Sequence, residues 1–119
     1  MVNRRKIGSE YEDLAAQYLS EKGWQILTRN FRCRFGEIDL VASDGDTLVF
    51  VEVKYRKTAS SGLPEEAVSF QKRKTIAKVA DYYRVRYQIL DNVPCRFDVI
   101  AIENREIRHY QNAFPYRGH

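Results

Sequence analysis

The chain has 119 residues, of which 44% are hydrophobic and 30% are charged, and its formal net charge is +4 at pH 7. These values are typical of one soluble globular domain, so we expect residues 1–119 to form a single domain. No apolar run approaches the roughly 20 residues of a membrane span, and no secretory signal follows the basic amino terminus, which excludes a membrane protein and favours the cytoplasm. The positive charge favours a polyanionic partner such as nucleic acid.

Cysteine and histidine show no pattern of metal ligands. Cys33 and Cys95 lie far apart, and His109 and His119 have no partner at ligand spacing. We therefore expect free thiols in a reducing compartment and neither zinc chemistry nor a Ser-His triad.

The first predicted element is a helix over residues 9–22. Apolar side chains recur there at helical spacing, and Gly23 follows as a stop signal. Ser9 and Glu12 have the spacing of a capping box, in which the glutamate reaches back to the amide of the cap residue. Taken alone, this spacing makes Glu12 a helix-capping residue.

A strand over residues 24–31 is expected next, at an edge of the sheet, because the apolar side chains alternate only loosely. The turn that follows it contains Arg32 and Arg34. They are either solvated turn residues or phosphate contacts, which position nucleic acid without reading its bases.

Residues 37–42 and 50–54 predict the central hairpin, joined by an Asp-Gly turn. Because side chains alternate along a strand, an even loop gathers Glu37, Asp39, Glu52 and Lys54 on one face. The opposite face is then wholly aliphatic, with Ile38, Leu40 and Ala42 from the first strand. If Gly45–Asp46 is the turn, Asp39 lies opposite Glu52; if Asp44–Gly45 is the turn, Glu37 faces Glu52.

Such a cluster of carboxylates is unfavourable without a counter-charge. Two carboxylates about 5 Å apart repel by roughly 3 kcal/mol at an effective dielectric near 20. A divalent cation would remove this repulsion, and carboxylate oxygens suit magnesium, manganese or calcium better than zinc. The alternative is that Glu52 pairs with Lys54 or nearby arginines on a solvated face. The apolar surroundings of Glu52 indicate a central strand, which rarely carries two charges without a use for them.

The segment 55–64 is small, polar and basic, and predicts a loop at the mouth of the site, where Arg56 and Lys57 would meet a bound strand. Pro64 suits a helix start. The main helix is expected over residues 69–87, with an apolar stripe that includes Tyr83 and Tyr87. Lys72, in its first turn, is either a phosphate contact or part of a solvated basic face.

Two more strands are expected over residues 96–102 and 106–110, before a tail anchored by Phe114. Asp98 fits a structural role, paired with Arg96 or a helix lysine, better than that of an additional acid in the site. The order helix, three strands, helix, two strands predicts an α/β fold with a mixed sheet flanked by helices.

An ordered set of motifs runs through nearly the whole chain. Its members are Gly8, Glu12-x-x-Ala15, Asn30-x-Arg32, Gly36-Glu-Ile-Asp-Leu, Phe50-Val-Glu-Val-Lys-x-Arg56, Lys72, Ala80, Arg96-Phe-Asp98 and Asn112-Ala-Phe114. In these motifs the chain resembles the YraN family of uncharacterised bacterial proteins, within the PD-(D/E)xK nuclease superfamily. That family is similar to archaeal Holliday junction resolvases. The resemblance implies a restriction endonuclease-like core.

The resemblance also implies a site and an activity. Asp39 would be the lone acid, and Glu52, Val53 and Lys54 the E-x-K motif. Asp39, Glu52 and the Val53 carbonyl would bind Mg²⁺ or Mn²⁺ with help from Glu12. Lys54 would orient the attacking water or offset the negative charge that develops in the transition state. The implied function is a magnesium-dependent endonuclease acting on DNA, including branched DNA such as Holliday junctions, with room for a homodimer. The alternative is a non-catalytic nuclease-fold module that binds nucleic acid or a protein partner.

Overall fold

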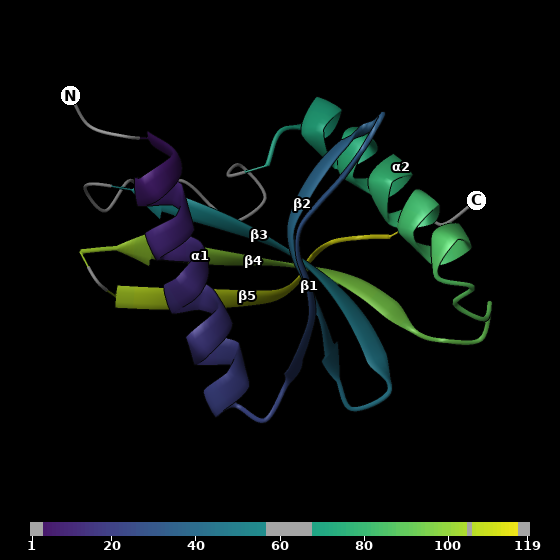
Figure 1. Ribbon diagram of the computed structural model, residues 1–119, viewed down its shortest axis with the longest axis horizontal. Coiled ribbons are helices and arrows are strands. Elements are labelled where there is room, and N and C mark those ends of the chain that lie inside the picture. Colours follow the sequence, from purple (N-terminus) through teal and green to yellow (C-terminus); the bar gives the residue numbers. More distant parts are fainter. Residues whose placement is uncertain (1–3, 57–67, 105, 117–119) are drawn as a thin grey trace.

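The computed structural model describes residues 4–56, 68–104 and 106–116, and it shows a twisted sheet flanked by two helices (Figure 1). The elements are α1 (Arg4–Glu21), β1 (Gln25–Cys33), β2 (Gly36–Asp44), β3 (Thr47–Arg56), α2 (Phe70–Arg86), β4 (Cys95–Glu103) and β5 (Glu106–Phe114). The predicted order and the α/β class are therefore confirmed. The segment 57–67, with Lys57 and the expected helix start at Pro64, lies outside the described residues.

The five strands form one mixed sheet in the order β1-β2-β3-β4-β5. The pair β3–β4 is parallel and its connection contains α2, whereas the other three pairs are antiparallel. The strand β1 lies at an edge, as predicted. None of the helices in the described ranges is both long and apolar enough to cross a membrane.

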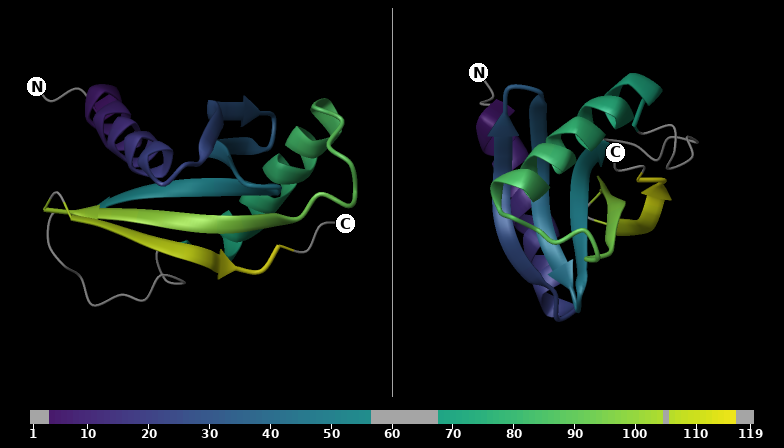
Figure 2. Two further views of the ribbon diagram at one scale, coloured as in Figure 1. Left: turned by 90° about the horizontal axis from the view of Figure 1, so that it is seen from below. Right: turned by 90° about the vertical axis from the view of Figure 1, so that its right-hand side faces the viewer.

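Alternating side chains of the central strands form two hydrophobic clusters, one packed against each helix. Figure 2 shows the two helices against different parts of the sheet. In β3, Leu48 and Phe50 pack towards α2, whereas Val49 and Val51 pack towards α1. A strand covered on both faces should be almost entirely apolar. Polar residues that interrupt β3 and β4 therefore need a specific explanation.

Both helices differ in detail from their predictions. The helix α1 begins at Arg4, so Ser9 and Glu12 lie inside it and the capping-box interpretation is wrong. Gly23 follows its end with φ +91°, a conformation that favours glycine. The helix α2 has the predicted bounds, with Ser69 accepting a hydrogen bond from the Lys72 amide at 3.1 Å as N-cap. Tyr87 was placed in the buried stripe but is 48% exposed, because it follows the last helical turn.

The hairpin of β2 and β3 has the first of the two predicted registers. Asp44 pairs with Thr47, which makes Gly45–Asp46 the two-residue turn. Pairing between the strands ends at Leu40–Val51, and the start of β2 continues beside β1 alone. This part of β2 twists away from the sheet, so Ile38 packs under α2 while Leu40 and Ala42 pack under α1. The prediction that these three side chains share one face is therefore wrong.

Candidate active site

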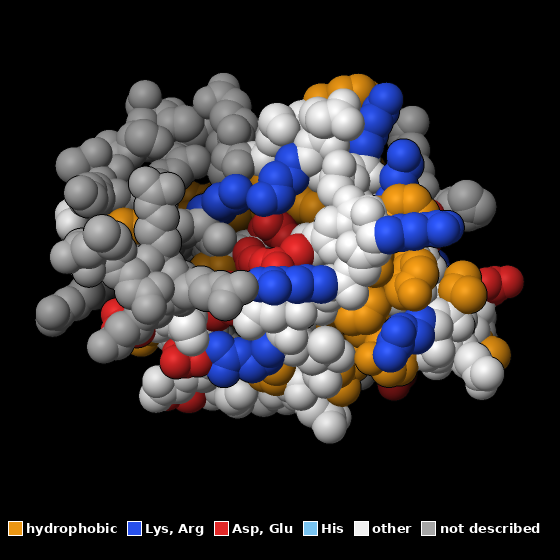
Figure 3. All heavy atoms as spheres, turned by 45° about the horizontal axis from the view of Figure 1, so that its top comes forward, with side chains coloured by type: hydrophobic (Ala, Val, Ile, Leu, Met, Phe, Trp, Pro, Cys, Tyr) orange, Lys and Arg blue, Asp and Glu red, His pale blue; other side chains and the backbone are white. Residues whose placement is uncertain are grey.

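A pocket of about 410 Å³ lies between the start of β2, the second half of β3 and the first turns of α2. Its lining residues are Glu37, Asp39, Glu52, Ser69, Gln71, Lys72, Thr75 and Ile76. In Figure 3, acidic side chains gather at the base of a hollow and basic side chains lie on either side of it. The predicted meeting of Asp39 and Glu52 in one open pocket is thus found.

A glycine allows β2 to approach α2 closely enough to form this pocket. A Cβ atom at Gly36 would lie 2.8 Å from Cγ2 of Thr75 and 3.5 Å from Cγ2 of Val79. The residue also has φ +150°, which side chains of L-amino acids rarely adopt. Gly36 therefore holds the acidic start of β2 against the first turns of α2.

Asp39 lies where β2 separates from β3, and its carboxylate replaces a backbone carbonyl as hydrogen-bond acceptor. Its Oδ2 accepts a hydrogen bond from the Val53 amide at 2.8 Å. Burial raises the pKa of Asp39, and this effect outweighs the Val53 bond, which lowers it.

Glu52 is the most perturbed acid of the pocket. It is 3% exposed, and burial together with the nearby charge of Asp39 raises its pKa from 4.5 to about 7. Its Oε2 lies 3.6 Å from Nζ of Lys72, whereas its Oε1 is buried without a hydrogen-bond partner in the described structure. A buried oxygen of this kind is rare and calls for an explanation such as an ion or a ligand.

Two lysines lie close to the acids of the pocket, and Lys72 is the one of them that lines it. Burial lowers the pKa of Lys54, and the neighbouring charge of Lys72 lowers it further, although Glu52 and Asp39 act in the opposite direction. Lys72 reaches Glu52 from the first turn of α2. The sequence suggested a phosphate contact for Lys72 but did not indicate this contact with an acid.

Glu12 faces the same acidic group from α1. Burial raises its pKa, a hydrogen bond with Asn30 lowers it, and the charges of Asp39 and Glu37 raise it further. Among the described residues, its Oε1 has no hydrogen-bond partner. Tyr11 stacks on Tyr55 with ring centroids 4.1 Å apart, which links this turn of α1 to β3. However, within the described residues no three histidine, cysteine or acidic side chains converge closely enough to hold a metal ion.

The predicted phosphate contacts have different surroundings. Arg32 is paired with Glu37 at the rim of the pocket. Arg34 lies in the β1–β2 turn, with its Cζ 4.8 Å from the ring centroid of Phe35. Arg56 is the last residue of β3, and only its backbone is described.

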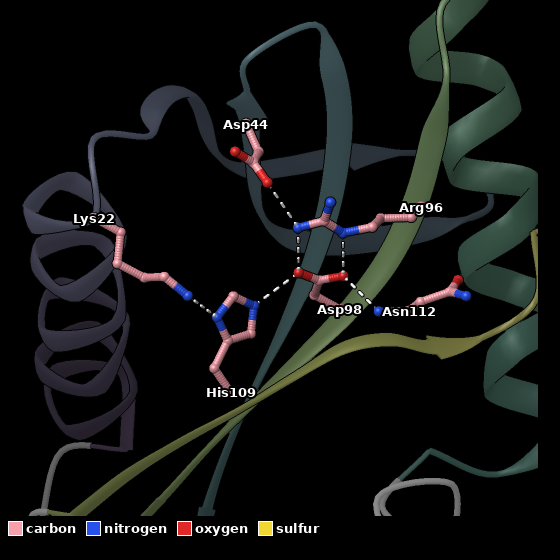
Figure 4. Close-up of polar contacts among 6 residues, drawn as sticks. All are labelled: Lys22, Asp44, Arg96, Asp98, His109 and Asn112. Carbon is pink, nitrogen blue, oxygen red and sulfur yellow. Dashed lines mark hydrogen bonds and ion pairs between the residues drawn. The ribbon is translucent and has the colours of Figure 1, made fainter.

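Asp98 belongs to a separate buried cluster (Figure 4). It is 0% exposed and accepts hydrogen bonds from Arg96 Nε at 3.0 Å, the Asn112 amide at 2.9 Å and His109 Nε2 at 2.7 Å. Burial alone would raise its pKa, but these bonds outweigh it and hold the pKa of Asp98 below its ordinary range. The predicted structural role and the pairing with Arg96 are confirmed.

His109, for which the sequence indicated no metal-ligand partner, is central to this cluster. Lys22 can only donate, so its bond to Nδ1 at 3.2 Å leaves the imidazole proton on Nε2, facing Asp98. The ring also packs edge-on against Trp24 at 5.2 Å. The only indication in the sequence was that His109 lies on the predicted strand that follows the strand of Asp98. This order does not identify which side chains of the two strands pair.

The fold and the pocket define the class of protein. The αβββαββ order, the mixed sheet and an acidic pair at the point where two central strands separate are consistent with a restriction endonuclease-like core.

The chain belongs to the Uncharacterised protein family UPF0102, whose model matches residues 11–102, and this confirms the resemblance to the YraN family. A UPF0102 protein of Lachnoclostridium phytofermentans is 49% identical over 117 residues, covering 98% of this chain and 99% of the relative. One from Geobacter sulfurreducens is 50% identical over 113 residues, covering 91% and 88%. A third, from Carboxydothermus hydrogenoformans, is 42% identical over 119 residues, covering 97% and 100%.

Proposed function

We propose that this protein is a magnesium-dependent nuclease that hydrolyses phosphodiester bonds in DNA, including branched DNA. The observation that carries the proposal is the carboxylate of Glu52, which is buried beside Asp39 in an open pocket with one oxygen unpartnered. Perturbed acids that converge in a pocket are typical of functional sites.

The donor set of the pocket fits a magnesium ion. Asp39, Glu52 and the Val53 carbonyl would hold it, and the unpartnered Oε1 of Glu52 is an oxygen ready for such a ligand. Magnesium keeps several of its waters and commonly binds proteins through one or two carboxylates, so a third side chain is not required. When bound, the ion would lower the pKa of a water and neutralise charge on the scissile phosphate.

The residues of the chain itself would bind and orient the substrate. Lys54 and Lys72 would face the phosphate and offset the negative charge that develops during hydrolysis. Arg32, paired with Glu37 of the pocket, and Arg34, in the β1–β2 turn, would hold the flanking backbone without reading the bases. Glu12 would orient waters around the acidic pair from the side of α1.

A cleavage panel tests the proposal. Single-stranded, duplex, flapped and four-way DNA, with an RNA control, are incubated with Mg²⁺ or Mn²⁺. We expect Glu52→Gln and Asp39→Asn to remove cleavage, and Asp46→Asn in the exposed turn to retain it as the matched control. Cleavage at the wild-type rate in both pocket variants would refute the assignment.

The alternative is a non-catalytic module that binds nucleic acid or a protein partner. The contact of Lys72 with Glu52 favours it, because a lysine already supplies part of the missing positive charge. Isothermal titration with Mg²⁺ separates the two functions. A heat of Mg²⁺ binding that is present in wild type and absent in Glu52→Gln supports the metal-dependent enzyme. An identical heat of binding in wild type and variant supports the non-catalytic module.

A further inference from the structure

Exposed aromatic rings alternate with arginines along one side of α2 and the adjoining β1–β2 turn. We call this surface the aromatic-basic stripe and define it as Arg34, Phe35, Tyr82, Arg86 and Tyr87. Arg34 lies over the ring of Phe35 at 4.8 Å, and the rings of Phe35 and Tyr82 meet edge-on at 6.4 Å. Arg86 lies 5.7 Å from the ring centroid of Tyr87.

The rings of the stripe are supported from below and open to solvent above. Phe35 is 38% exposed and Tyr87 is 48% exposed, whereas the neighbouring Tyr83 is only 4% exposed. Tyr87 rests on Tyr83 with ring centroids 4.5 Å apart and contacts the buried Phe31 at 6.2 Å. The rings are therefore held in place by the core while part of their surface remains free.

The stripe is continuous with the acidic pocket. Phe35 precedes Gly36, which contacts Thr75, and Thr75 lines the pocket. From Thr75 the helix continues to Arg86, a distance of about 16 Å at 1.5 Å per residue. Figure 3 shows basic side chains alternating with hydrophobic ones to the right of the acidic hollow. A chain that leaves the pocket in this direction would pass over the stripe.

We propose that the aromatic-basic stripe binds an unpaired DNA strand, with bases stacked on Phe35 and Tyr87 and phosphates at Arg34 and Arg86. Single strands are bound in this way because every base has a stacking face and every nucleotide has a charge. The inference rests on the proposed nuclease function and names its substrate class, which is DNA with a single-stranded segment beside the cleavage point.

A second copy of the chain is a less suitable occupant of the stripe. In a two-fold symmetric dimer the same surface patch meets itself. Arg34 and Arg86 would then lie among like charges from the other subunit, which opposes association. The charge of the stripe is complementary to a polyanion instead.

The test is binding of a fluorescent oligothymidylate, measured by anisotropy in EDTA so that cleavage cannot occur. We expect Phe35→Ala and Tyr87→Ala each to weaken binding about 5- to 100-fold, the range reported by single base-stacking contacts. Tyr87→Phe, which keeps the ring, should bind like wild type. So should Leu90→Ala, which removes an exposed apolar side chain outside the stripe. Thermal unfolding of each variant checks that it is folded.

The outcomes distinguish this inference from the nuclease proposal. Binding is measured without metal, so a protein that cleaves none of the DNA substrates can still bind the oligonucleotide, and failure of cleavage leaves this test intact. Wild-type affinity in both alanine variants would overturn the inference. An equal loss of affinity for a blunt duplex would overturn the preference for an unpaired strand. A dimer in sedimentation that Tyr87→Ala dissociates, with oligonucleotide binding unchanged, would assign the stripe to self-association instead.

Discussion

Replacing Glu52 with glutamine should stabilise the protein at neutral and alkaline pH. The folded structure raises the pKa of this carboxyl from 4.5 to about 7, chiefly by burial and then by the charge of Asp39. A raised carboxyl pKa means that the folded state favours the protonated form. The stability that this gives is complete below pH 4.5 and is lost as the pH rises through about 7.

The magnitude follows from the difference between the two pKa values. A rise from 4.5 to about 7 corresponds to about 3 kcal/mol of folding free energy lost once Glu52 is ionised, at 1.36 kcal/mol per unit. Glutamine has nearly the same shape and cannot ionise, so at pH 8 the variant should exceed wild type by about 3 kcal/mol. For a chain of this size that is on the order of 10 °C in the midpoint of thermal unfolding.

Urea unfolding followed by fluorescence of the single tryptophan, the buried Trp24, measures this difference between pH 4 and pH 8. Glu10→Gln, at an exposed position of α1, is the matched control and should follow wild type at every pH. The reasoning would be refuted if Glu52→Gln were no more stable than wild type at pH 8, or if its gain in stability were as large at pH 4 as at pH 8. Added Mg²⁺ should reduce the difference in stability between Glu52→Gln and wild type at pH 8, because it stabilises only the protein that retains the carboxylate.

The same measurement checks predictions for two other parts of the fold. Asp98→Ala leaves Arg96 and a buried histidine without their carboxylate and should cost about 3–5 kcal/mol at pH 7, whereas Asp44→Ala, at a half-exposed ion pair, should cost less than about 1 kcal/mol. Because the pKa of Asp98 is held low, the stability from its ionised form is present at neutral pH and lost in acid, so the Asp98→Ala deficit should shrink on acidification. Gly36→Ala places a methyl group against Thr75 and should cost about 1–3 kcal/mol, and Thr75→Ser, which removes the clashing atom, should recover part of it.

The parts predicted correctly from sequence follow from local patterns. Apolar spacing fixed the two helices and five strands to within a few residues, apart from the longer start of α1 and the longer β5. An even loop was sufficient to bring Asp39 and Glu52 together, because side chains alternate in every register that keeps charges out of the core. The choice between two turns stayed open, since the sequence Asp-Gly-Asp suits either. The Asp44–Thr47 pair decides it.

The parts that could not be predicted depend on where an element leaves its neighbours. Ile38 changes sides because β2 separates from β3 beyond Leu40, and no local pattern marks that point. Lys72 meets Glu52 across the contact between α2 and the sheet, an arrangement that no local pattern specifies. Asp98 and His109 meet beside the register shift between β4 and β5, and no local pattern predicts where that shift occurs.

A comparison of the two least exposed carboxylates among the described residues, Asp98 and Glu52, shows why Glu52 is the stronger candidate for function. Asp98 is 0% exposed and Glu52 is 3% exposed, so burial alone does not distinguish them. Hydrogen-bond donors surround Asp98 and lower its pKa, so the ionised form of Asp98 stabilises the folded state. Glu52 retains an unpartnered oxygen, its pKa is raised, and its ionised form reduces stability at the pH at which most proteins work. A cation that binds at Glu52 would neutralise this unfavourable buried charge, and its binding would therefore stabilise the folded protein.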